Sequence, residues 1–166
     1  SSKWHDEIKK HGAYPTTTKY NGMQTLADAG KKLYTNREYN PYVEAFWKWW
    51  PDLYPALHTF RVTGGEPLMN KNTFKMMDWI IENDKPNTNL LLGINSNFCV
   101  DDKLFNKFIN QAHKVLQSKK VRKLEIYTSA EAQGEKAEYI RTGFEYKKFF
   151  NNMDRVLNEF KDYENF

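Results

Sequence analysis

The stretch TFRVTGGEPLMNKNTF, residues 59–74, determines how the rest of the sequence is interpreted. A short run rich in β-branched and aromatic residues breaks into Gly64-Gly65-Glu66-Pro67, and a helical pattern follows at once. This change of hydrophobic period predicts a strand, a tight loop and a helix. The two glycines let the backbone turn sharply and leave its amides and carbonyls accessible to a ligand, and Pro67 restricts the chain after the turn.

Glu66 in this loop has two interpretations. A carboxylate at the mouth of a sheet is a suitable partner for an ammonium group, and neighbouring backbone carbonyls would add acceptors for the same cation. The alternative is an ordinary tight turn whose glutamate faces solvent or pairs with a lysine. Because short motifs also occur by chance, the tetrapeptide alone leaves both interpretations open.

The chain after this loop repeats the strand-to-helix pattern. We predict strands over residues 58–63, 89–97 and 121–129, and helices over residues 71–83, 101–117, 135–142 and 147–161. Strands that alternate with helices indicate an α/β fold with a parallel sheet and right-handed crossovers.

The part of the chain before the first strand is predicted to be helical with loops. We expect helices over residues 2–11, 23–33 and 40–50, with an irregular turn as the alternative for residues 23–33. The third has the strongest end signals, because Asn40 is a good N-cap and Pro41 suits the first helical position. Pro51 is expected to end this helix.

Unusual residues follow each predicted strand at the same end. Gly64 and Gly65 follow the first, Asn95-Ser96-Asn97 end the second, and Ser129 and Glu131 follow the third. In parallel sheets ligands bind at the carboxyl ends of the strands. The three loops therefore predict one binding site at this edge.

The composition indicates one folded domain of 166 residues, with 40% hydrophobic residues and a mild net charge of +4. The lysines are dispersed, so charge gives little support for binding to nucleic acid or to a membrane surface. Cys99 is the only cysteine, which excludes an internal disulfide and indicates a cytoplasmic protein. Neither a secretory leader nor an apolar segment of membrane-spanning length is recognisable.

Two further features have ordinary structural interpretations. The aromatic stretch FWKWWPDLY, residues 46–54, resembles an amphipathic helix that packs its tryptophans on a sheet, and stacking on nucleic-acid bases is the alternative. The four histidines lack the spacing of a metal site, so we expect no metal at these residues.

Several segments together resemble the radical S-adenosylmethionine (SAM) enzymes, in particular those with a twitch or SPASM-type C-terminal extension. The segments are SSKW, EIKKHG, EAFWKWWP, GGEPLM, INSN and EIYTSAEAQGEKAEYIRTGFEY, in this order. The resemblance implies a partial (β/α)6 barrel, of which the three predicted strands would be the second, third and fourth.

The resemblance also assigns roles to residues. The loop formed by Gly64, Gly65, Glu66 and Pro67 would hold the amino group of S-adenosylmethionine. Ser129 and Glu131 would lie near its ribose and carboxylate, and Arg141 would pair with the carboxylate, for which a guanidinium group is well shaped. Asn95 and Asn97 would line the floor of the pocket.

One departure from the family concerns the iron–sulfur cluster. The family holds a [4Fe–4S] cluster with a Cys-x3-Cys-x2-Cys loop, because such clusters need thiolate ligands, and this sequence has one cysteine. We therefore expect residues 1–166 to be an incomplete core domain that starts just after the cysteine loop and lacks the later strands. Without the cluster this chain is expected to be inactive and to contain no bound cofactor.

Three function classes follow from these expectations. The first is a segment of a radical SAM enzyme whose full-length form binds S-adenosylmethionine and a [4Fe–4S] cluster, generates a 5′-deoxyadenosyl radical and modifies a peptide or small molecule. The second is a cluster-free relative that acts as a binding module. The third is a nucleic-acid or protein-interaction domain, which salt-dependent binding would reveal. In an incomplete domain, uncovered aromatic surfaces would also favour self-association.

Overall fold

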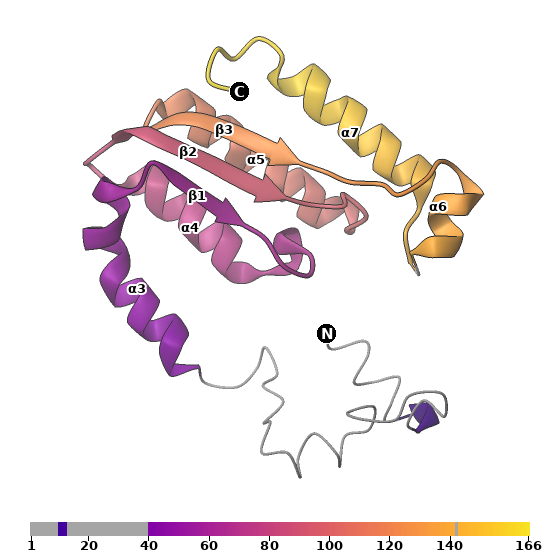
Figure 1. Cartoon of the computed structure of the whole chain (residues 1–166). Coiled ribbons are helices and arrows are strands. Elements are labelled where there is room, and N and C mark those ends of the chain that lie inside the picture. Colours follow the sequence, from indigo (N-terminus) through magenta and orange to yellow (C-terminus); the bar gives the residue numbers. More distant parts are fainter. Residues whose placement is uncertain (1–9, 13–39, 142) are drawn as a thin grey trace. The chain divides into compact units, whose positions relative to one another are not determined.

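The computed structural model describes residues 10–12, 40–141 and 143–166, which form an α/β fold with a three-stranded parallel sheet (Figure 1). The described α-helices are α3 (Pro41–Leu53), α4 (Lys71–Glu82), α5 (Asp102–Ser118), α6 (Glu135–Ile140) and α7 (Tyr146–Phe160). The strands are β1 (Thr59–Val62), β2 (Asn87–Asn95) and β3 (Val121–Tyr127), and two 3-10 helices are η1 (Tyr54–Ala56) and η2 (Pro67–Met69). This arrangement confirms the predicted α/β fold with a parallel sheet.

The chain divides into two compact units, residues 1–48 and residues 49–166. In the first unit, Lys10 and His11 are helical. The remainder of the helix predicted over residues 2–11, and the whole of the one predicted over 23–33, lie outside the described residues. The start of α3 confirms the predicted cap, because the backbone N–H of Tyr42 donates to Asn40 Oδ1 at 3.0 Å.

The prediction that Pro51 ends this helix is wrong, because α3 includes Pro51 and continues to Leu53. A proline removes one backbone donor, but its fixed φ of about −65° is itself compatible with a helix. The loss falls in the last turn, and the chain tightens at once into η1. A single missing hydrogen bond is therefore tolerated at this point.

The strands lie in the order β1-β2-β3, which places β2 in the centre. Arg61 of β1 pairs with Gly93 of β2, and Gly93 pairs with Glu125 of β3. Two residues nearer the carboxyl edge, Asn95 pairs with Tyr127. Because side chains alternate between the faces of a sheet, these residues share one face.

Helices α4 and α5 cover the other face of the sheet (Figure 1). Each begins with a side-chain cap: Asn70 Oδ1 accepts from Asn72 N at 2.9 Å, and Asp101 Oδ1 accepts from Leu104 N at 2.9 Å. The apolar side of α4 is buried at Phe74, Met77 and Ile80. Burial of side chains of this size stabilises the fold by roughly 1.5–3 kcal/mol each.

The aromatic stretch contributes to this core through Trp50. Its side chain is fully buried, with ring centroids 4.9 Å from Phe60 and 5.8 Å from Trp79. The predicted packing of tryptophan on the sheet is confirmed for Trp50, whereas Trp49 is 58% exposed. Large apolar side chains are also exposed on the helices near the C-terminus, namely Tyr139, Ile140, Phe150 and Leu157.

The face of the sheet that no described helix covers, named the uncovered face below, is polar. Its exposed or half-buried side chains include Arg61, Lys123, Glu125 and Tyr127. Helix α7 lies on the opposite side, against α5, where the rings of Phe160 and His113 are 4.8 Å apart. None of the helices within the described residues combines the length and the apolar character that a membrane span needs.

Candidate functional site

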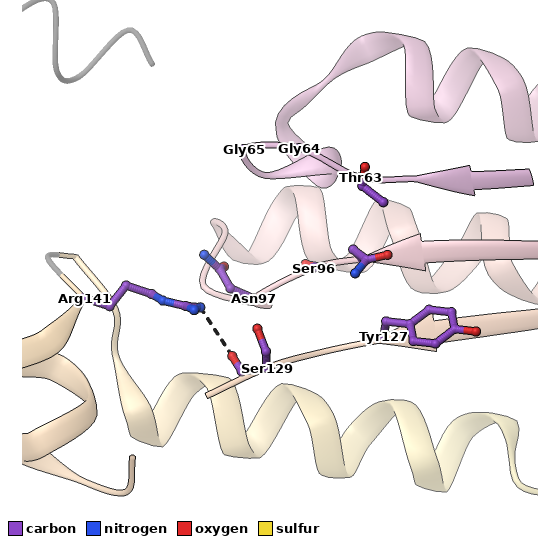
Figure 2. Close-up of a pocket in the computed structure, with 9 residues that line it drawn as sticks. Thr63, Gly64, Gly65, Ser96, Asn97, Tyr127, Ser129 and Arg141 are labelled. Carbon is purple, nitrogen blue, oxygen red and sulfur yellow. Dashed lines mark hydrogen bonds between the residues drawn. The ribbon is translucent and has the colours of Figure 1, made fainter. Parts of the chain in front are cut away.

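A pocket of about 370 Å³ lies where the three strands end (Figure 2). It is lined by Thr63, Gly64, Gly65, Asn95, Ser96, Asn97, Tyr127, Ser129 and Arg141. The volume is within the range of small-molecule sites, which is roughly 300–1,000 Å³. Loops from β1, β2 and β3 all contribute, so residues that are 78 positions apart in the sequence, from Thr63 to Arg141, meet in one place.

Most of the predicted site residues line this pocket. They are Gly64, Gly65, Asn95, Asn97, Ser129 and Arg141. Glu66, Pro67 and Glu131 do not line it. Ser96, which the sequence placed at this edge without a role of its own, also lines the pocket. The sequence interpretation missed Thr63 and Tyr127 as lining residues, although the two-residue alternation along the chain places Tyr127 on the same side as Ser129.

The double glycine supplies a turn that other residues adopt with difficulty. Gly64 has a φ of 109°, and a Cβ atom added there would meet no atom within 4 Å. The backbone conformation therefore requires glycine at this position, whereas the space beside it is open toward the pocket. A ligand can approach the backbone here without obstruction by a side chain.

The Glu66 carboxylate connects two of the loops. Its Oε1 accepts from Leu68 N at 3.0 Å and from Ser96 Oγ at 2.8 Å. Its Oε2 accepts from Asn97 N at 2.9 Å. An ionised carboxylate has about four acceptor positions, and these donors take three. The side chain of Glu66 thus ties the loop after β1 to the loop after β2.

The loop after β2 contains a strained residue. Phe98 has a φ of 55°, which is unusual for a bulky side chain. Its ring is buried, with its centroid 5.6 Å from that of Phe105. Its N–H donates to Ser96 Oγ at 2.9 Å, and its carbonyl accepts from Asn152 Nδ2 at 2.8 Å. Such strain persists where the surroundings enforce it, and it is concentrated at functional sites.

Asn95 presents an unused acceptor at the pocket. Its Oδ1 is buried and has no hydrogen-bond partner among the described residues, and the residue lines the pocket. A buried acceptor without a donor costs about 1–3 kcal/mol. This cost is removed when a ligand donates an N–H or O–H to the atom.

Arg141 contributes the cation of the pocket lining and is oriented by its own loop. Its Nη1 donates to the carbonyl of Ser129 at 3.3 Å (Figure 2), and its Nη2 forms an ion pair with Glu131. Glu131 therefore lies against Arg141 and not in the pocket lining. A guanidinium group has five N–H donors, so further donors remain for a ligand.

The thiol of Cys99 lies in the loop after β2. Burial raises the pKa of the Cys99 thiol, and its Sγ lies 3.6 Å from the carbonyl oxygen of Glu145. The raised pKa favours the protonated thiol. Within the described part of the chain, no three His, Cys, Asp or Glu side chains form a group that could hold a metal ion.

No protein-family model, curated protein or solved structure matches the chain.

Proposed function

We propose that the pocket at the carboxyl edge of the sheet binds S-adenosylmethionine, and that the chain forms part of a radical SAM-type partial barrel. In this proposal β1, β2 and β3 correspond to the second, third and fourth strands of that barrel. The observation that carries the proposal is that Gly64, Gly65, Asn95 and Arg141 line one pocket, and that Asn95 Oδ1 has no hydrogen-bond partner among the described residues.

The chemistry of these groups suits the methionine portion of S-adenosylmethionine. An ammonium group needs acceptors, which the open backbone beside Gly64 and the buried Asn95 Oδ1 supply. A carboxylate is well matched by the planar guanidinium of Arg141. The role of Glu66 in this proposal is to hold the two loops in position through its three hydrogen bonds.

The residues of this chain do not fit the iron–sulfur cluster of radical SAM enzymes. Such a cluster takes thiolate ligands, and Cys99 is the single cysteine of the sequence. In those enzymes the cluster and S-adenosylmethionine together produce the radical. We therefore assign to this chain the binding of S-adenosylmethionine and no step of radical chemistry.

Isothermal titration calorimetry with S-adenosylmethionine tests the proposal. We expect saturable binding by the wild type, and at least about tenfold weaker binding after Asn95→Leu, because a hydrogen bond to a charged group contributes roughly 1.5–3 kcal/mol. The matched control is Asn110→Leu, since Asn110 is exposed on α5.

The stability of the same variants separates a binding role from a structural one. Asn95→Leu removes a buried acceptor that has no partner among the described residues, so its free energy of unfolding should equal or exceed that of the wild type. Absence of binding by the wild type, or equal affinities of the wild type and Asn95→Leu, would overturn the proposal.

A further inference from the structure

A glycine in the middle of the central strand marks a close approach of side chains. Glycine weakens a strand interior and often occurs where another group approaches the backbone. A Cβ atom at Gly93 would lie 2.9 Å from Arg61 Cγ and 3.2 Å from Tyr127 Cε2. The missing side chain of Gly93 therefore provides the space in which Arg61 crosses the uncovered face of β2.

Arg61 is held firmly in this crossing position. Its Nη2 donates to the hydroxyl of Tyr127 at 2.6 Å, and its Cζ lies 4.2 Å from the centroid of the Tyr127 ring. Both contacts reach from β1 to β3 over the central strand. The guanidinium is thus oriented before any ligand arrives, which reduces the entropy lost on binding.

The charges around Arg61 leave a positive group on this face. Glu125 is paired with Lys123, whose Nζ lies 3.5 Å from its Oε1, and it also accepts a hydrogen bond from Tyr127. No ion pair within the described residues includes Arg61, whose hydrogen-bond partner is the uncharged Tyr127 hydroxyl. One guanidinium, one ammonium and one carboxylate therefore carry a net charge of +1.

Arg61 also adjoins the pocket. Tyr127, which holds it, is a lining residue, and the pair Asn95–Tyr127 is two residues nearer the carboxyl edge than the pair Arg61–Gly93. Arg61 is exposed, and a guanidinium group binds carboxylates and phosphates through two parallel hydrogen bonds. Arg61 therefore lies on the same face of the sheet as the lining residues Asn95 and Tyr127.

We propose that Arg61, lying over Gly93 and held by Tyr127, is an anion-binding site that extends the pocket along the uncovered face of the sheet. It takes a carboxylate or phosphate group of a ligand. This site is distinct from Arg141, which lies in the loop after β3, and it does not depend on the binding of S-adenosylmethionine.

The test is a titration of the 15N-labelled chain of residues 1–166 with inorganic phosphate and, separately, with malonate, followed by NMR. The backbone amide of Gly93 is the reporter, since Arg61 lies directly over it. We expect a saturable shift with at least one probe, and at least about tenfold weaker binding in Arg61→Gln, as expected for a charge-assisted hydrogen bond. The probe that binds more tightly shows whether the site prefers a phosphate or a carboxylate.

Three further variants test whether the shift of Gly93 comes from an anion bound at Arg61. Arg122→Gln removes the same charge from an exposed residue that alternates to the other face of β3, and it should bind as the wild type does. Arg61→Lys keeps the charge without the planar fork and should bind severalfold more weakly. Arg141→Gln should leave the Gly93 shift intact.

Each outcome decides the inference. A Gly93 shift that saturates in the wild type and is lost in Arg61→Gln supports it. It is overturned if neither probe produces a saturable shift, if Arg61→Gln binds as the wild type does, or if Arg141→Gln alone abolishes binding. Since the probes are inorganic phosphate and malonate, failure here is independent of the calorimetry with S-adenosylmethionine.

Discussion

At the scale of single residues, the backbone and the side chains of the loop after β1 have different roles. Gly64 and Gly65 line the pocket, whereas the carboxylate of Glu66 accepts hydrogen bonds from the loops around it. The interpretation of Glu66 as a direct partner of an ammonium group stays a prediction. The structure adds a second role, in which Glu66 fixes the positions of Ser96 and Asn97.

The substitution Glu66→Gln tests this second role. The amide keeps the shape of the side chain but has an NH2 group in place of one oxygen, so it loses either the bond from Asn97 N or the bonds from Leu68 N and Ser96 Oγ. We expect a loss of about 1–3 kcal/mol in the free energy of unfolding, measured by urea denaturation. The control Glu82→Gln changes an exposed residue at the end of α4. Equal denaturation midpoints of the two variants would contradict the role of Glu66 in holding the two loops together.

A pair of glycine substitutions tests how tightly Arg61 lies over the central strand. Gly93→Ala places a methyl group 2.9 Å from Arg61 Cγ, and overpacking of this kind typically costs about 1–3 kcal/mol. Gly65→Ala is the matched control, because nothing lies within 4 Å of its added Cβ. Thermal unfolding followed by circular dichroism should show a lower midpoint for Gly93→Ala alone. A midpoint unchanged from that of the wild type would mean that Arg61 moves aside freely.

At the scale of elements, side chains connect β1 and β3 across the face of β2. The hydrogen bond from Tyr127 is the main reason that the pKa of Glu125 lies below its ordinary value. The same hydrogen bond raises the pKa of Tyr127. A lowered carboxyl pKa stabilises the fold above the pKa of the unfolded chain and ceases to do so as the pH falls through the folded value. A raised phenol pKa stabilises the fold below its ordinary value and ceases to do so as the pH rises through the folded value.

The substitution Tyr127→Phe should therefore have an effect that depends on pH. The difference in free energy of unfolding between the wild type and Tyr127→Phe should be largest near neutral pH. It should shrink in acid, where Glu125 becomes protonated, and in strong alkali, where Tyr127 ionises. Urea denaturation over a pH series measures this difference, with Tyr139→Phe as the control because Tyr139 is 92% exposed. A difference that stays constant with pH would show that the hydroxyl does not act through Glu125.

At the scale of the whole molecule, the core described by the structure belongs to one part of the chain. The buried hydrophobic residues of the described part begin at Trp50 and end at Phe160, all within the unit of residues 49–166. The C-terminus is attached to this unit, because Leu124 N of β3 donates to the carbonyl of Asn165 at 2.9 Å.

We therefore expect a shortened chain of residues 40–166, which keeps the Asn40 cap of α3, to retain the fold. Its free energy of unfolding should differ from that of the full chain by no more than about 1 kcal/mol, the size of an ordinary mutational effect. Near-ultraviolet circular dichroism and a cooperative urea transition are the measurements. Loss of the near-ultraviolet signal in the shortened chain would show that residues 1–39 contribute to the core.

Periodicity predicted the helices and strands after residue 40 well, because it reports local burial. The strand predicted over residues 89–97 is β2, Asn87–Asn95, and the helix predicted over 101–117 is α5, Asp102–Ser118. The prediction that Pro51 ends α3 was wrong because it considered the helix in isolation. Pro51 lies in the last turn of α3, and this turn packs onto the sheet through Trp50.

The sequence by itself determined which residues form strands and helices, and that the carboxyl ends of the parallel strands carry Gly64, Asn95 and Ser129. Those properties depend on neighbours along the chain. Only the tertiary structure decided which side chains face the pocket, because that depends on the register of distant segments. In the folded chain, Glu66 accepts a hydrogen bond from Ser96, and Glu131 forms an ion pair with Arg141. Arg61 lies over Gly93. Contacts between separate strands have no signature in local periodicity.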